Sequence, residues 1–305
     1  MRSALFDIAK IFCDHGYETT NYFTKSAGDA TRVAAQYGLD YDLIVACGGD
    51  GTMNEVVSGI LSLPEPRDFG YIPAGSTNDY AITLGFPTCV RRAAKIAVTN
   101  KAVPVDIGKF TAEGGIDRKF AYIASFGAFT KLSYNTPQHM KNQLGHTAYL
   151  IEGVLALKEV RPHRLRYTCD GKTEEGYFVF GAVMNTISLA GFYSFPSKDI
   201  SLDDGLFDVI LVRAPSNIFG YGGTLLDLAR RKYNDNNIVF LHGKDIKFEF
   251  TEPTPFTLDG EYGGAVMAAK MENLPRMLNI IKPANTTVEN RIIGTKRIVK
   301  KKTKK

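Results

Sequence analysis

The sequence lacks the features that mark a membrane-spanning or secreted protein. It contains no run of 18 or more apolar residues, and it does not open with a charged n-region followed by an apolar h-region. Its five histidines show neither the spacing of metal ligands nor the order of a Ser/His/Asp triad, so we assign them no catalytic role. We therefore expect a soluble, cytoplasmic protein, and its 305 residues are long enough for two domains.

Cysteine is also scarce. The four cysteines, Cys13, Cys47, Cys89 and Cys169, are scattered through the chain without the spacing of a metal site. Because disulfides are rare in the cytoplasm, we expect these thiols to be reduced and structural.

Acidic residues are absent from the last ten positions. Residues 296–305 contain seven Lys and Arg side chains, so the chain's net charge of +5 would be −2 without them. Such a tail is either a solvated end or a segment that holds the protein at an anionic membrane surface, at roughly 1 kcal/mol per basic residue. We do not predict nucleic-acid binding, since no basic patch with interleaved aromatic residues occurs elsewhere.

The most informative stretch is the Gly-rich segment Cys47–Gly59, CGGDGTMNEVVSG, which follows the apolar run 41–46. The pattern predicts a buried parallel strand, a turn and the start of a helix. Gly48, Gly49 and Gly51 allow close backbone approach, and the first helical turn offers free N–H groups to an anion. Asp50 would repel phosphate unless a cation lay between them, which indicates Mg²⁺. The alternative is a purely structural turn.

A second loop of the same composition follows the next predicted strand, residues 69–73. Its sequence, AGSTNDY, supplies small residues, the hydroxyls of Ser76 and Thr77, and the carboxylate of Asp79. The alternative is a helix cap, in which Ser76 or Thr77 caps the helix and Asp79 favours its dipole, and both roles can hold together. Thr24 follows a third predicted strand, Tyr17–Phe23, at the edge where open α/β sheets bind ligands.

The chain opens on a predicted helix, Ser3–His15, and a second helix is predicted over Asp29–Tyr37. A doubly wound domain normally opens with a strand, so a strand is missing here. We favour the interpretation that Met1 is an internal methionine of a longer reading frame, because losing a central strand would expose two edges of a parallel sheet.

Beyond residue 103 the pattern changes to strands, predicted over 119–125, 164–169, 177–185, 207–212, 237–241 and 245–250, with a hairpin signal at Asp170-Gly171. Two acidic turns there carry possible chemistry. Asp204, in the sequence SLDDGL, can ligate a hard cation together with turn carbonyls. Asp259 and Glu261, in LDGEYGG, are placed to position and deprotonate an alcohol. A plain turn is the alternative for both.

Four strings occur in order along the chain: GGDGTMNEVVSG, PAGSTNDYA, SLDDGLFDV and LDGEYGG. The first of them matches neither the dinucleotide fingerprint nor the P-loop. Together they resemble the soluble bacterial diacylglycerol kinases, whose superfamily includes sphingosine and ceramide kinases and, more distantly, NAD kinases. The resemblance runs over nearly the whole chain, but the Asn-Pro-x-x-Gly strand with which such proteins begin is absent.

The resemblance implies a role for each motif. Asp204 and the carbonyls of Ser201 and Leu206 would hold a structural Mg²⁺, linked through water to Asp50 and Asp79, and Asp259 and Glu261 would be the catalytic carboxylates. ATP would be held by the first loop and helix with two outlying residues, namely Gly49, Asp50, Gly51, Thr52, Met53, Asn54, Glu55, Thr24 and Ser76. To these we add Gly48, Thr77 and Asp79 as candidate cofactor-binding residues from the loop chemistry above.

The fold class that we expect is a doubly wound, Rossmann-like α/β domain over residues 1–103 and an antiparallel β-sandwich over 104–272. Residues 273–305 would return to the first domain and end in the basic tail, and an exposed edge of the sandwich would allow two subunits to pair. The expected activity is transfer of the ATP γ-phosphate to diacylglycerol or a related lipid. The alternatives are an NAD kinase, a sphingosine or ceramide kinase, and a catalytically inactive lipid-binding protein.

Overall fold

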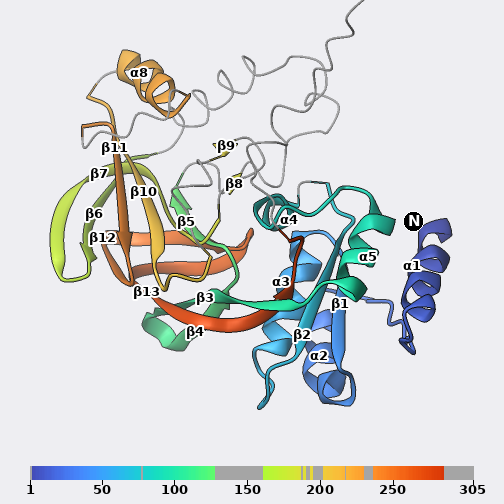
Figure 1. Cartoon of the computed structure of the whole chain (residues 1–305). Coiled ribbons are helices and arrows are strands. Elements are labelled where there is room, and N and C mark those ends of the chain that lie inside the picture. Colours follow the sequence, from blue (N-terminus) through green and yellow to red (C-terminus); the bar gives the residue numbers. More distant parts are fainter. Residues whose placement is uncertain are drawn as a thin grey trace, which may run out of the picture.

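The computed structural model describes residues 2–76, 78–127, 161–186, 188–189, 193–194, 202–216, 218–229 and 236–284. These residues form an α/β half and a β-sandwich half, which lie side by side in Figure 1. Strands β3 and β13 run from one half into the other, so the two halves share a hydrogen-bonded sheet. The expected combination of an α/β domain and an antiparallel sandwich is confirmed.

The α/β half combines short parallel strands with amphipathic helices. Strand β1 pairs in parallel with β2, and helix α3 connects them, as expected for a β-α-β crossover. Helix α1 packs on α5, and α2 packs on α3. The bounds are α1 (Arg2–Asp14), α2 (Asp29–Tyr37), the 3-10 turn η1 (Gly38–Asp40), β1 (Leu43–Gly48), α3 (Asp50–Ile60), β2 (Asp68–Pro73), α4 (Asp79–Thr83) and α5 (Val90–Thr99).

The second half is built mainly from antiparallel strands. Buried and solvated residues alternate along β6 and β12, whereas β10 and the second part of β7 are buried on both faces. Strand β7 pairs with β5, β6 and β10, while β12 pairs with β5, β6 and β13. The bounds are β3 (Ala102–Ala112), η2 (Glu113–Gly115), β4 (Ile116–Phe120), β5 (Ile123–Gly127), β6 (His163–Cys169), β7 (Lys172–Met184), β8 (Ser188–Leu189), β9 (Tyr193–Ser194), β10 (Phe207–Arg213), α8 (Ile218–Ala229), β11 (Ile238–Gly243), β12 (Asp245–Leu258) and β13 (Glu261–Ile281).

Strand β13 is the element that joins the halves. Its first part pairs with β12 in the sandwich, and its last three residues, 279–281, pair in parallel with residues 68–70 of β2. Between these parts the register against β3 shifts, and Arg276 adopts a positive φ of 57°. This bulge turns the strand from one half toward the other.

One predicted strand is wrong. Residues 17–23 lie in an irregular and largely exposed segment between α1 and α2, not in a strand. A strand is stable only when its backbone groups pair with a neighbour. Within the described part of the chain, β1 pairs only with β2, and residues 17–23 pair with no strand.

A second prediction needs correction, because the single strand expected over residues 119–125 is two strands. Strand β4 ends at Phe120 and β5 begins at Ile123, with a bend at residues 121 and 122. In a continuous strand, successive N–H groups point in opposite directions. The bend instead turns three consecutive N–H groups toward one carboxylate, that of Asp259.

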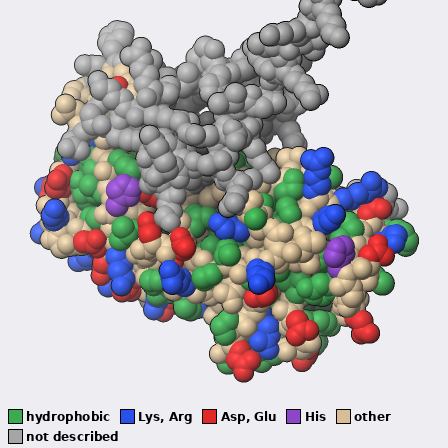
Figure 2. Space-filling view, in the orientation of Figure 1, with side chains coloured by type: hydrophobic (Ala, Val, Ile, Leu, Met, Phe, Trp, Pro, Cys, Tyr) green, Lys and Arg blue, Asp and Glu red, His purple; other side chains and the backbone are tan. Residues whose placement is uncertain are grey.

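Two apolar clusters form the core. One lies inside the sandwich, and the other fills the α/β half and continues onto residues of β7 and β10 such as Phe180 and Ile210. All four cysteines are free thiols, as expected, although only Cys169 is buried. Among the described helices, none has the length and apolar character needed to cross a bilayer. Figure 2 shows basic and acidic side chains interspersed over the face in view.

Candidate active site

The two predicted Gly-rich loops lie against each other. Because β1 and β2 are parallel, their loops leave the same edge of the sheet. The N–H group of Ala74 donates to the carbonyl of Gly48 at 2.8 Å. A Cβ atom on Gly75 would lie 2.4 Å from the Cα atom of Gly49, so this contact requires glycine. The fold therefore joins the two loops into one surface.

Asp50 links the first loop to the second. It is the first residue of α3, and its carboxylate accepts hydrogen bonds from the N–H groups of Asp79 at 3.2 Å and Tyr80 at 3.4 Å. Burial raises the pKa of the Asp50 carboxyl above its usual value, against the opposing effect of these backbone donors. Asp79 is buried and Asp50 is half-buried, so two predicted acidic residues lie at the base of the joined loops.

The helix-cap interpretation of the second loop holds in part: Asp79 lies in the first turn of α4, as expected, but the N-cap position differs from the predicted one. The N-cap residue of α4 is Asn78, which has a positive φ of 55° and makes no side-chain capping bond. Its side-chain amide instead bonds twice to Gly75: Oδ1 accepts from the Gly75 N–H group at 3.0 Å, and Nδ2 donates to the Gly75 carbonyl at 2.8 Å. Ser76 is exposed beside this contact, while Thr77 lies outside the described residues.

The residues predicted along α3 have different environments. The side chain of Met53 is wholly buried in the core, so only its backbone faces the loop. Asn54 is buried at the edge of a cavity. The carboxylate of Glu55 accepts hydrogen bonds from the N–H groups of Gly28 at 2.8 Å and Ala30 at 3.1 Å, at the N-terminus of α2. Thr24 lies in the exposed segment before α2.

Asp259 and Gly260 form a two-residue hairpin turn between β12 and β13, with φ values of 50° and 87°. Two positive φ values in succession are the signature of a type I′ turn, which Asp-Gly favours. The turn alternative is therefore correct for the backbone of this motif. The two carboxylates of the motif leave this turn in different directions and reach different environments.

The Asp259 carboxylate is buried in a nest of backbone donors. Its Oδ2 accepts from Ala121 N–H at 2.6 Å, and its Oδ1 accepts from Tyr122 and Ile123 N–H at 3.0 Å each. Burial nevertheless outweighs these donors and raises the pKa of Asp259 to about 7, with a further contribution from the charge of Asp50.

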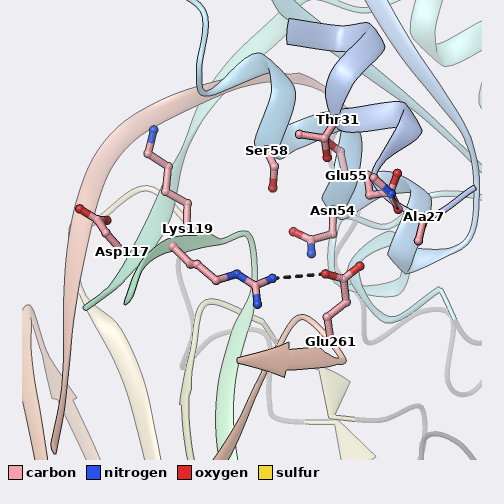
Figure 3. Close-up of a pocket in the computed structure, with 10 residues that line it drawn as sticks. Ala27, Thr31, Asn54, Glu55, Ser58, Asp117, Lys119 and Glu261 are labelled. Atoms are coloured by element: carbon pink, nitrogen blue, oxygen red, sulfur yellow. Dashed lines mark hydrogen bonds and ion pairs between the residues drawn. The ribbon is translucent and has the colours of Figure 1, made fainter. Parts of the chain in front are cut away.

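Glu261, by contrast, is 42% exposed and lines a cavity between the two halves. The cavity has a volume of about 540 Å³. Figure 3 shows Glu261 pointing from the start of β13 toward Asn54 of α3. The lining residues come from the α2 N-terminus, α3, β4 and β13, and they are Ala27, Gly28, Thr31, Asn54, Glu55, Ser58, Asp117, Arg118, Lys119 and Glu261.

The predicted cation loop is anchored by a carboxylate that sequence reasoning missed. Asp106 of β3 is fully buried and accepts hydrogen bonds from the N–H groups of Gly205 at 2.7 Å and Arg276 at 2.9 Å. Asp204 is exposed, and its Oδ1 accepts from Leu206 N–H at 3.0 Å. Ser201 lies outside the described residues. Asp106 thus ties the loop to the bulge of β13.

The oxygen atoms around this loop suit a hard cation. Asn185 and Asn273 donate their amide N–H groups to the carbonyls of Asp106 at 3.2 Å and Leu206 at 3.1 Å. Their own Oδ1 atoms are buried and have no hydrogen-bond partner among the described residues. The part of the chain that the structure describes has no cluster of three His, Cys, Asp or Glu side chains there, so a metal would have mostly carbonyl, amide and water ligands, as Mg²⁺ accepts.

Two basic residues of the cavity were also missed. Arg118 and Lys119 lie on β4, where the charged string Asp117-Arg118-Lys119 precedes an apolar run.

Among the residues that the sequence analysis missed, Asp106 does carry a signal: it is a lone carboxylate inside an apolar run, and buried carboxylates are rare without a special role. No comparable signal exists for Arg118, since charged residues on a strand edge are common.

The α/β half with its two Gly-rich loops faces the β-sandwich half across the cavity, and two family models match these two parts of the chain. Residues 1–110 match the family model described as the diacylglycerol kinase catalytic domain, and residues 127–282 match the YegS C-terminal NAD kinase beta sandwich-like domain. An NAD kinase from Archaeoglobus fulgidus, solved with ATP, has a TM-score of 0.52 at 14% identity over 91% of this chain and 89% of its own, a likeness of fold alone.

Other relatives are more similar. The chain is 34% identical to the diacylglycerol kinase of Bacillus subtilis, over 92% of this chain and 90% of that protein. It is 33% identical to that of Staphylococcus carnosus, over 88% and 86%. The crystal structure of a diacylglycerol kinase from Bacillus anthracis has a TM-score of 0.72 at 24% identity, over 92% and 91%. The chain belongs to the diacylglycerol kinase family, and it is a lipid kinase.

Proposed function

We propose that this protein transfers the γ-phosphate of ATP to the free hydroxyl of diacylglycerol, giving phosphatidic acid. The observation that carries the proposal is the position of Glu261, which lines the same cavity as Asn54 and Glu55 of the nucleotide-loop helix. A carboxylate that faces a phosphate-binding loop can hold an acceptor hydroxyl in line for attack. The relatives named above support diacylglycerol as the acceptor.

In the proposed reaction, the hydroxyl oxygen attacks the γ-phosphorus while the bond to the β,γ-bridging oxygen breaks. Glu261 receives the hydroxyl proton, because it is the carboxylate of the pair that lines the cavity. Asp259 is enclosed by backbone donors and holds the turn that presents Glu261. The N–H groups of the joined loops would cradle the phosphates.

Magnesium fits two places in this scheme. When bound with the nucleotide near Asp50, Mg²⁺ would neutralise charge on the phosphates. A structural ion would take the carboxylate of Asp204 and the carbonyls of Ser201 and Leu206. The buried Oδ1 atoms of Asn185 and Asn273 support an ion or its water shell beside that loop.

The test is transfer of labelled γ-phosphate from ATP, with Mg²⁺, to short-chain diacylglycerol in mixed micelles. We expect label in phosphatidic acid, a loss of activity in Asp50→Ala, and a loss of about 100-fold or more in Glu261→Gln. Glu175→Gln is the matched control, since Glu175 is a carboxylate paired with Arg164 on the sandwich surface. Parallel assays with ceramide, sphingosine and NAD identify the acceptor, and labelling of NAD alone would contradict the proposal.

A further inference from the structure

One short segment contacts both carboxylates of the β12–β13 turn. The N–H groups of Ala121, Tyr122 and Ile123 hold Asp259. Three residues earlier, the guanidinium of Arg118 contacts the other carboxylate: its Nη2 lies 3.3 Å from Oε2 of Glu261. The same guanidinium donates through Nη1 to the carbonyl of Tyr262 at 2.7 Å. Segment 118–123 therefore fixes the turn from one side.

The two Arg118 contacts differ from an ordinary surface ion pair. Because the planar guanidinium bonds the Glu261 carboxylate and the next residue's carbonyl together, it fixes the side chain relative to its own backbone. The side chains of Arg118 and Glu261 are 37% and 42% exposed, so the pair contributes little to stability. Its effect is on geometry, since a free glutamate side chain would sample several rotamers.

The neighbouring cation does not share this position. The Nζ atom of Lys119 donates to the carbonyl of Leu61 at 2.8 Å, at the C-terminal end of α3. Figure 3 shows the Lys119 side chain turned away from Glu261, while the dashed line marks the ion pair that Glu261 makes with Arg118. Lys119 thus links β4 to the α/β half, whereas Arg118 bonds to the hairpin turn.

We propose that Arg118 is a positioning residue for phosphoryl transfer, which holds Glu261 toward the acceptor hydroxyl in the cavity. This inference rests on the proposed function. Loss of the guanidinium should release Glu261 from its orientation, because both hydrogen bonds that tie the side chain to the turn are lost. A misplacement of about 1 Å can cost roughly 100-fold in rate, so we expect Arg118→Gln to lower kcat by about 10- to 100-fold. The KM for ATP should stay within about twofold.

The conservative variant separates charge from geometry. Arg118→Lys keeps the positive charge but cannot make both contacts with one planar group. We therefore expect it to recover only part of the lost kcat. It also provides a second reading of the same position if Arg118→Gln is poorly folded. Arg164→Gln is the matched control, because Arg164 pairs with Glu175 between β6 and β7 and should leave kcat unchanged.

A double-mutant cycle tests whether Arg118 acts through Glu261. If Arg118 acts through Glu261, the double variant Arg118→Gln/Glu261→Gln is as slow as Glu261→Gln alone. Independent, multiplicative losses would overturn the inference, as would a normal kcat in Arg118→Gln. If the wild-type protein phosphorylates lipid and Glu261→Gln does not, the proposed function stands whichever way Arg118 behaves. A wild-type protein that labels no lipid removes both.

Discussion

At the scale of single residues, Asp259 has the most unusual environment in the site. It is an aspartate at a positive φ, it is buried, and its carboxylate accepts three backbone N–H groups. The three donors favour the charged form of the carboxylate, whereas burial disfavours it. The effect of burial is the larger one, so the pKa of Asp259 is raised to about 7. The carboxylate therefore changes its protonation state near neutral pH.

This pKa shift predicts a pH dependence of stability. The folded protein keeps a proton on Asp259 up to about pH 7, whereas the unfolded chain releases it near 3.8. Since the folded state binds more protons between these values, its free energy of unfolding should fall as pH rises from about 4 to 7 and then level off. The loss attributable to this group is at most roughly 4 kcal/mol.

The measurement is urea unfolding at several pH values for the wild type and Asp259→Asn. Contributions from other titrating groups cancel in the difference between the two proteins. We expect that difference to change steadily across the range from about pH 4 to 7. A difference that stays constant with pH would show that Asp259 is not titrating in the folded protein.

At the scale of elements, the packing of α3 against α2 depends on Gly59. A Cβ atom there would lie 2.6 Å from both the Cβ of Ala34 and the carbonyl oxygen of Thr31. Alanine normally stabilises a helix interior relative to glycine by about 1 kcal/mol. At Gly59 the added methyl group would clash with the backbone of α2, and we expect the cost of this clash to exceed the gain in helix propensity. Gly59→Ala should therefore lower the free energy of unfolding by about 1 to 3 kcal/mol.

Ser58→Ala, one residue earlier in α3, is the control for helix propensity and should be neutral or slightly stabilising. The two variants are compared by their urea midpoints. Because Glu55 of α3 also bonds the N-terminus of α2, a shift of α2 in Gly59→Ala should weaken ATP binding as well. An increase in stability in Gly59→Ala would contradict the close packing of the two helices.

Elements with strong periodicity could be predicted from the sequence, whereas elements that depend on neighbours could not. The helix over residues 29–37, the Asp170-Gly171 hairpin and the two Gly-rich loops follow from local patterns and are all present. The strand over 17–23 failed because its propensity had no pairing partner in the described fold. The bend at 121–122 could not be foreseen, since it exists to meet Asp259, which lies 138 residues beyond Ala121 in the sequence.

At the scale of the whole molecule, the two halves are not independent cores. Residues of β7 and β10 belong to the same apolar cluster as the interior of the α/β half, and β13 contributes hydrogen bonds to both. We therefore predict that the described fold unfolds in one cooperative step. Hydrogen exchange in increasing urea should give peptides of β2 and β10 the same denaturant dependence. Earlier exchange of β2 would contradict the prediction.

The position of residues 279–281 has a consequence for synthesis. These residues lie between β2 and β3 in the sheet of the α/β half, yet they come after almost all of the sandwich in the sequence. During translation the α/β half cannot complete its sheet until those late residues have left the ribosome. The half that is synthesised first is therefore the last to be finished, and until then the exposed edge of β2 needs protection from aggregation.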